Sequence, residues 1–204
     1  MTSVLISGAA IAGPTLAFWL KAAGFEPTLI ERAPGLRTGV YVIDFWGLGY
    51  DIAERMGLIA EINRSGYHVK EMRIEDDRGR GCAGFGTSIF ADLTRGRYVT
   101  LPRSELSRLL FQKIRDCAEC IFDDELVELQ EQTERVRVRL KHAGERRFDL
   151  VIGADRLHST VRDLAFGPCE QFRETSRLHG RCLRISRLSP ARREHLFDVR
   201  PWAA

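Results

Sequence analysis

The feature that most constrains this chain is a turn near its start that is framed by two glycines. Gly8 and Gly13 occupy the first and third glycine positions of the G-x-G-x-x-G pattern of dinucleotide-binding loops, and Ala10 occupies the second. In such a loop the first glycine makes the turn out of a strand, the second lets the backbone approach a pyrophosphate, and the third lets the helix pack closely. The methyl group of Ala10 is tolerable if the φ angle stays negative and costs more if φ must be positive.

The residues on either side of this turn predict a strand, a helix and a second strand. Residues 3–7 form a short apolar run that suits a buried parallel strand, and residues 11–23 carry apolar residues at helical spacing before Gly24 ends the helix. Residues 27–30 predict the next strand, and Glu31 follows at about the distance expected for the acid that binds a ribose hydroxyl. The pattern therefore predicts a nucleotide-binding βαβ unit, with a βαβ unit that binds no nucleotide as the alternative.

The rest of the chain predicts a mixture of helices and strands without an internal repeat. The patterns favour helices at 49–56, 59–65, 103–116 and 159–165. They favour strands of one small sheet at 69–76, 81–90 and 98–101, a hairpin at 126–129 and 136–140, and a buried strand at 148–153. This mixture predicts an α/β fold, a Rossmann-like nucleotide domain interleaved with part of a mainly antiparallel sheet.

Composition and charge exclude several classes of protein. Of the 204 residues 44% are hydrophobic and 29% charged, which is ordinary for a soluble protein. Residues 176–204 hold seven arginines against two acids, but no aromatic stacking pattern accompanies them, so nucleic-acid binding is not favoured. The longest apolar run, residues 11–20, is about half of a membrane span. No secretory signal is present, and we expect a cytoplasmic protein with no membrane partner.

The cysteines and histidines give no metal site. Cys117 and Cys120 form a C-x-x-C pair among five cysteines, but no second pair or histidine partner follows, as a zinc ribbon would require. The five histidines are scattered along the chain, and no Ser-His-Asp constellation is present. We therefore assign no metal ligand and no catalytic side chain.

Four stretches resemble the FAD-dependent aromatic hydroxylases and related monooxygenases of the para-hydroxybenzoate hydroxylase type, including bacterial antibiotic-oxidising members. They are VLISGAAIAGPTLAFWLKAAGFEPTLIER, LRTGVYVIDFWG, LPRSELSRLL and DLVIGADRLHSTVR. The resemblance implies FAD as cofactor and NAD(P)H as electron donor. It also implies O₂-dependent hydroxylation of an aromatic or polycyclic small molecule, with the chemistry carried by the flavin. The alternatives are a non-catalytic fragment that binds FAD or another nucleotide and an NAD(P)-dependent dehydrogenase.

The resemblance also implies roles for residues outside the first loop. Arg32 would lie near the adenine, or else be a solvated arginine at a strand end. Arg103 would hold the phosphate or ribityl side of FAD, or else begin its helix in water. Leu126 would touch the adenine through its backbone. Asp155 would contact the ribityl chain or the nicotinamide, or else cap the helix that follows it.

The sequence departs from the family pattern at two loops and near its end. Val40 stands where the family has a second glycine, and Arg156 replaces the glycine that follows the aspartate of the second fingerprint. No third fingerprint with Gly-Asp-Ala-Ala follows. We therefore expect a truncated member of the family. Residues 1–172 should form an FAD-binding domain with inserted substrate-sheet strands at about 69–101, and residues 173–204 a basic tail that is native, out of frame or disordered. We also expect exposed apolar faces in the insertion, weak FAD binding and little hydroxylation.

Overall fold

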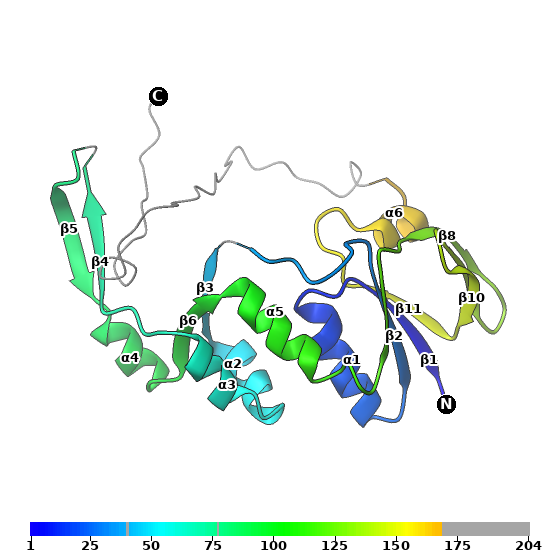
Figure 1. Ribbon diagram of the computed structural model, residues 1–204, viewed down its shortest axis with the longest axis horizontal. Helices are drawn as coiled ribbons and strands as arrows, with labels where there is room; N and C mark the ends of the chain where they lie inside the picture. Colours follow the sequence, from blue (N-terminus) through cyan, green and yellow to red (C-terminus); the bar gives the residue numbers. More distant parts are fainter. Residues whose placement is uncertain (40, 77, 169–204) are drawn as a thin grey trace. The chain divides into compact units, whose positions relative to one another are not determined.

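The computed structural model describes residues 1–39, 41–76 and 78–168, which form two compact units (Figure 1). Unit 1 consists of the described residues before 40 and after 103, and unit 2 consists of those between them. Unit 2 is therefore an insertion in unit 1. It contains the strands that the sequence placed at about 69–101 and begins well before them. The tail predicted at 173–204 lies outside the described residues.

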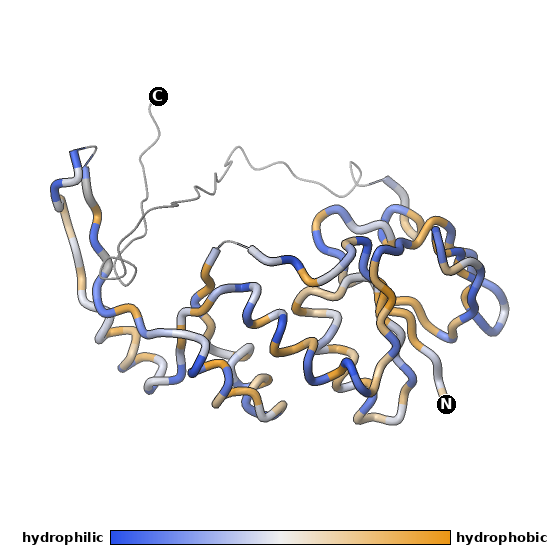
Figure 2. The backbone as a smooth tube through the Cα atoms, viewed as in Figure 1, coloured by the Kyte–Doolittle hydropathy of each residue, from blue (hydrophilic) through white to orange (hydrophobic). Residues whose placement is uncertain are grey.

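Unit 1 is built on a four-stranded parallel sheet with the order β11-β1-β2-β7. Its strands are β1 (Ser3–Ser7), β2 (Glu26–Glu31), β7 (Glu119–Phe122) and β11 (Leu150–Gly153). Helix α1 (Ala12–Ala22) joins β1 to β2, which confirms the predicted βαβ unit. The central strands are apolar on both faces, and Figure 2 shows hydrophobic residues along β1 and β2. Leu5, Ile6 and Leu29 are fully buried there.

A three-stranded antiparallel sheet also belongs to unit 1. Its strands are β8 (Leu126–Glu131), β9 (Val136–Leu140) and β10 (Gly144–Phe148), in the order β10-β9-β8. The sequence predicted the first two strands and missed β10, because its residues GERRF are mostly charged. One face of this sheet packs into a core cluster with Leu5 and Ile30 through Val138, Leu140 and Phe148.

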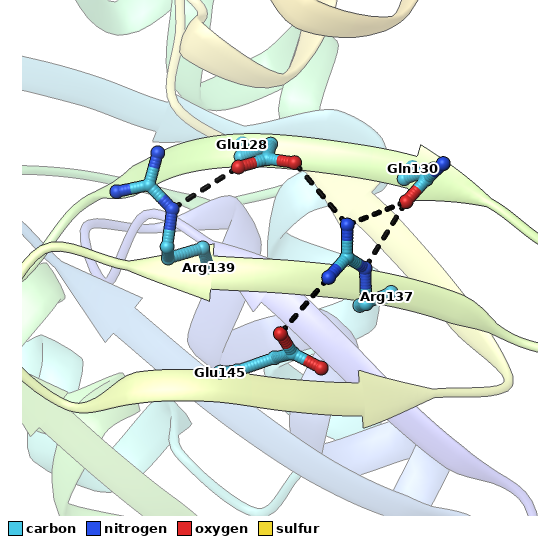
Figure 3. Close-up of polar contacts among 5 residues, drawn as sticks. All are labelled: Glu128, Gln130, Arg137, Arg139 and Glu145. Carbon is cyan, nitrogen blue, oxygen red and sulfur yellow. Dashed lines mark hydrogen bonds and ion pairs between the residues drawn. The ribbon is translucent and has the colours of Figure 1, made fainter.

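Charged side chains from all three strands form a cross-strand network on this sheet (Figure 3). Arg137 of β9 pairs with Glu128 of β8 at 3.4 Å and with Glu145 of β10 at 3.0 Å, and it also donates to Gln130. Arg139 pairs with the other oxygen of Glu128 at 3.1 Å. These pairs are partly exposed, so each contributes about 0.2–1 kcal/mol. The network supports the strand register and gives the charges of β10 a structural role.

Two further helices occur in the part of the chain from the end of the insertion onward. Helix α5 (Arg103–Gln112) starts at the predicted residue and ends four residues before the predicted end, because a turn begins at residue 113. Ile114 in this turn is still fully buried. Helix α6 (Thr160–Phe166) follows β11 and matches the predicted helix within one residue at each end. Within the described ranges, no helix has the length and apolar character needed to cross a membrane.

Unit 2 contains three helices and two separate two-stranded ladders among its described residues. The helices are α2 (Gly47–Arg55), α3 (Ile59–Ser65) and α4 (Ser88–Thr94). The ladders pair β3 (Val42–Trp46) with β6 (Tyr98–Pro102), and β4 (Glu71–Glu75) with β5 (Gly81–Gly86).

This arrangement corrects the prediction of one small sheet for the insertion. The predicted strand 81–90 ends at Gly86, and α4 follows it, so the β-forming side chains Ile89 and Phe90 lie on a helix. β6 pairs with β3, which the sequence did not predict, rather than with β4 or β5. As expected, large apolar side chains of the insertion are exposed: Ile74, Phe85, Ile89 and Phe90.

Candidate dinucleotide site

The candidate site lies at the carboxyl edge of the parallel sheet. Ser7 ends β1, where it is in register with Gly153 of β11 on one side and with Ile30 of β2 on the other. Three segments that the sequence singled out leave the sheet at this edge: the glycine loop after β1, Glu31 at the end of β2, and the loop after β11. Ligands of open α/β sheets bind at this edge, so the topology brings the predicted residues to the expected place.

The two glycines of the first loop are required by close contacts. Gly8 has a φ of +110°, and a Cβ atom there would lie 2.6 Å from the carbonyl oxygen of Ala154 in the second loop. A Cβ atom on Gly13 would lie 1.9 Å from the carbonyl oxygen of Gly8. Both distances are far inside van der Waals contact. The loop can therefore pack on α1 and on the second loop only with glycine at these two positions.

Ala10 meets the condition under which alanine is tolerable. Within the described part of the chain, the non-glycine residues with positive φ are Arg95, Asp123 and Arg156, so Ala10 has a negative φ. Its carbonyl oxygen accepts a hydrogen bond of 2.7 Å from the hydroxyl of Ser107 on α5. The methyl group therefore causes no backbone strain in this loop.

Glu31 is held against the first loop by hydrogen bonds to its carboxylate. One carboxylate oxygen accepts from the backbone N–H of Ala9 at 3.1 Å, and the other accepts from the N–H of Ala33 at 3.1 Å. The guanidinium of Arg37 lies 4.0 Å away. Each carboxylate oxygen has more than one acceptor site, so the group retains capacity for ribose hydroxyls. The contact with Ala9 is a second role for Glu31 that spacing did not reveal.

The N-terminus of α1 offers free backbone donors. No side chain caps this helix, and its first turn contains no acid. The N–H of Gly8 donates to Ile30 at 2.7 Å, but in the described part of the chain no acceptor takes the N–H groups of residues 10–13. Uncapped N–H groups at a helix start form a binding site for an anion. The donors available to a pyrophosphate thus begin at Ala10, because those of Gly8 and Ala9 are already used.

The carboxylate of Asp155 in the second loop is half satisfied. Its Oδ2 atom accepts from the hydroxyl of Ser7 at 3.2 Å and from the backbone N–H groups of Thr160 at 2.8 Å and Val161 at 3.3 Å. Asp155 therefore caps α6, as the alternative interpretation proposed. Its Oδ1 atom is buried and has no hydrogen-bond partner among the described residues. An orphaned buried acceptor is costly, which fits a site that receives a hydroxyl group of a ligand.

The other residues predicted to contact FAD are Arg103, Arg32 and Leu126. Arg103 is the first residue of α5 and lies in unit 2, where its N–H donates to the carbonyl of Tyr41 at 3.1 Å and its guanidinium lies 5.9 Å from the Tyr41 ring centroid. Arg32 is exposed, in agreement with a solvated strand end. The side chain of Leu126 is buried in the core, so only its backbone remains for an adenine. The cofactor contacts of these residues remain predictions.

Sequence reasoning missed Asp124, whose backbone N–H contacts the end of the strand that carries Glu31. Asp124 is almost fully buried, and its N–H donates to the carbonyl of Glu31 at 3.2 Å. Burial alone would raise the pKa of Asp124, but backbone N–H groups of His142, Ala143 and Glu125 outweigh it and hold the pKa below its ordinary value. An aspartate between two strands is a common turn signal, but it does not reveal which strand end the turn holds.

The positions of the His, Cys, Asp and Glu side chains bear on metal binding. Among residues 1–39, 41–76 and 78–168, no group of three or more His, Cys, Asp and Glu side chains is arranged to hold a metal ion. The cysteines of the C-x-x-C pair are free thiols. Burial, followed by the nearby Cys117 and Glu119, raises the pKa of the Cys120 thiol to about 11. A thiol with such a pKa is a poor nucleophile at neutral pH.

Comparison with known proteins supports a flavin site. Residues 1–181 match the family described as FAD binding domain. An uncharacterized protein of Mycobacterium tuberculosis is 39% identical over 180 residues, covering 84% of this chain and 46% of that protein. A flavin-dependent monooxygenase of Legionella longbeachae is 30% identical over 169 residues, covering 80% of this chain and 41% of that protein. The crystal structure of tetracycline destructase Tet(55) is similar with a TM-score of 0.70 and 32% identity, covering 80% of this chain and 40% of that one. The chain thus spans less than half the length of these relatives.

Proposed function

This chain belongs to the FAD binding domain family, whose members include flavin-dependent monooxygenases, and from that premise we propose that unit 1 binds the adenosine diphosphate half of FAD. The observation that carries the proposal is the convergence, at the end of β1, of three groups with hydrogen-bonding capacity left for a ligand. These are the free N–H groups at the start of α1, the carboxylate of Glu31, and the orphaned oxygen of Asp155.

Each group has a role that its chemistry suits. The N–H groups of residues 10–13 donate to the pyrophosphate, because the helix start favours negative charge. Glu31 accepts from the ribose hydroxyls of the adenosine while it holds Ala9. The Oδ1 atom of Asp155 accepts from a hydroxyl group of the cofactor or of the nicotinamide donor. Arg103, Arg32 and the backbone of Leu126 are proposed as further FAD contacts.

The reaction of the whole protein is also part of the proposal. When bound, FAD supplies the redox chemistry, so the protein needs no nucleophile of its own. We propose an NAD(P)H- and O₂-dependent hydroxylation of an aromatic or polycyclic small molecule in the cytoplasm. The names of the similar proteins support this class, since several are flavin-dependent monooxygenases and one is a tetracycline destructase. This chain's residues bind and orient the cofactor in that scheme.

A binding experiment tests the cofactor assignment. We would titrate the purified chain with FAD, FMN, ADP and NAD and follow flavin fluorescence or the heat of binding. The expected result is that FAD and ADP bind, that ADP competes with FAD, and that FMN, which lacks the adenosine, binds more weakly by at least tenfold. Absence of FAD binding would contradict the proposal, and tighter binding of NAD than of FAD would favour the dehydrogenase alternative.

The proposed reaction needs a separate assay. NADPH and NADH consumption would be followed with an oxygen electrode in the presence of candidate aromatic compounds, together with mass spectrometry of the products. A product that is heavier by one oxygen atom, labelled from ¹⁸O₂, is the expected result for a chain that carries the whole activity. NAD(P)H consumption without such a product would limit the function to FAD binding and electron transfer.

A further inference from the structure

We infer that Ser107 on α5 is a positioning residue for the pyrophosphate-binding loop, acting through the backbone of Ala10. This inference rests on the proposed FAD site. The hydroxyl of Ser107 donates to the carbonyl oxygen of Ala10 at 2.7 Å, across 97 residues of sequence. Both residues belong to unit 1, and Ser107 is 5% exposed. Ser107 is not one of the residues proposed to contact FAD, so its effect on binding must pass through the loop.

The hydrogen bond fixes the direction of one peptide group. The described peptide bonds are trans, so the C=O of Ala10 and the N–H of Ile11 lie in one peptide plane and point in opposite directions within it. Because the C=O points to α5, the N–H of Ile11 points away from α5. Ile11 is the N-cap residue immediately before α1, and no acceptor in the described part of the chain takes its N–H. Ser107 therefore orients one of the donors proposed for the pyrophosphate.

Two other hydrogen bonds fix the preceding peptide groups of the same loop. The N–H of Gly8 donates to Ile30, and the N–H of Ala9 donates to Glu31. Both of these contacts come from β2. Without Ser107 the peptide group between Ala10 and Ile11 would be held only by its chain neighbours. The loop is thus tied to two elements, to β2 through Gly8 and Ala9 and to α5 through Ala10.

The placement of Ser107 inside a helix supports a specific role for its hydroxyl. Serine in a helix interior commonly donates back to its own helix and is a weaker helix former than alanine. A buried hydroxyl also needs a partner to offset its loss of hydration. Here the hydroxyl donates out of the helix to the loop. Helix propensity alone would favour alanine at this position, so the bond to Ala10 is what the hydroxyl contributes.

The test compares Ser107→Ala with Ser104→Ala, which removes a hydroxyl from the same helix at a site without the loop contact. The full chain and both variants are titrated with ADP and with adenosine. We expect Ser107→Ala to weaken ADP binding by about five- to tenfold and adenosine binding by less than about twofold. Ser104→Ala should leave both unchanged. The difference between ADP and adenosine is the readout that a general loss of stability would not produce.

A second measurement decides the inference even if the proposed function fails. Amide hydrogen exchange of Gly8 and Ala9, whose N–H groups are hydrogen-bonded, is followed by NMR in the ligand-free chains. The Ser107→Ala variant should exchange these amides about five times faster than the parent chain, and Ser104→Ala should not. Unchanged exchange, or equal losses of ADP and adenosine binding, would overturn the role of Ser107. A chain that binds no ADP but shows the faster exchange would refute the FAD site and keep the positioning of the loop.

Discussion

The first and second loops at the carboxyl edge of the parallel sheet each carry a larger residue where the family pattern has glycine, and the structure accommodates the two differently. Ala10 in the first loop keeps a negative φ, which alanine adopts without strain. Arg156 in the second loop has a φ of +71°, in the left-handed region that favours glycine. The comparison shows that the local φ angle, rather than the motif position, sets the cost of losing a glycine.

The two loops also differ in what holds them. The backbone of the first is tied by Ile30, Glu31 and Ser107, and it retains glycine where a Cβ atom has no room. The second is organised by Asp155, which caps α6, and by Ser159, whose hydroxyl accepts from the N–H of Arg162 at 3.1 Å. A loop built around a helix cap can retain its fold with one strained residue, because the capping contacts come from its neighbours.

The largest expected effect is a break in the first loop. Gly13→Ala places a Cβ atom 1.9 Å from the carbonyl of Gly8, so α1 must move away from β1. We expect FAD affinity to fall by more than about a hundredfold, which is ~2.7 kcal/mol, together with a lower Tm. Gly35→Ala is the matched control, because no atom lies within 4 Å of its added Cβ. Equal behaviour of the two variants in binding and thermal unfolding would contradict the packing argument.

The next effect concerns the acid that holds the first loop. Glu31→Ala removes the acceptor for the N–H of Ala9 and the proposed acceptor for ribose hydroxyls. We expect a loss of about 1–3 kcal/mol in FAD binding, measured by titration. Glu26→Ala, at the exposed start of the same strand, serves as the control. Unchanged affinity in the Glu31 variant would mean that this carboxylate does not contact the cofactor.

The buried carboxylate of Asp124 gives a pH-dependent prediction. The lowered pKa of Asp124 means that its stabilisation is present above the unfolded pKa of about 3.9 and is lost as the pH falls through the folded value. Asp124→Asn should therefore lower the free energy of unfolding by about 1–2 kcal/mol at pH 7, with a gap that closes below about pH 4. Denaturant unfolding across this range measures it, and Asp123→Asn is the exposed neighbour used as control. A gap that stays constant with pH would refute the ionised carboxylate as its source.

Glycine at position 156 of the second loop should make the protein more stable. Arg156→Gly relieves the strain of the left-handed backbone. Glycine also gives the unfolded chain more conformational freedom, which offsets part of this gain. We expect a net increase of about 0.5–1 kcal/mol in the free energy of unfolding. Arg156→Ala removes the same side chain and its contacts but keeps the strain. The glycine variant should therefore be the more stable of the two by about 1 kcal/mol in denaturant unfolding. Equal stability would show that the φ angle carries no cost here.

The smallest effect is expected at Ala10, the second position of the glycine pattern. Ala10→Gly restores the full glycine pattern, but the negative φ of Ala10 leaves no strain to relieve. We expect a change in stability of less than about 1 kcal/mol and a change in FAD affinity of less than about threefold. A hundredfold gain in affinity, ~2.7 kcal/mol, would show that the alanine methyl already obstructs the loop.

Local patterns determined the elements that carry strong signals. The apolar run of β1 and the helical spacing of α1 and α3 were predicted to within a residue or two, because each signal lies inside its own segment. β3, β7 and β10 were missed, and residues 88–90, predicted as the end of a strand, belong to helix α4. Short segments such as these take their conformation from the strands and helices that they pack against.

The sequence by itself determined the glycine loop, the acid at the end of the second strand and the second fingerprint, and with them the family. Only the tertiary structure decided how these parts work together. It alone shows that Glu31 accepts from the N–H of Ala9 and that Ser107 on α5 donates to Ala10. It also shows that one carboxylate oxygen of Asp155 is buried without a hydrogen-bond partner among the described residues. The reason is physical: a motif fixes residue types over short spacings, whereas a hydrogen bond between residues nearly a hundred positions apart exists only after the strands have paired.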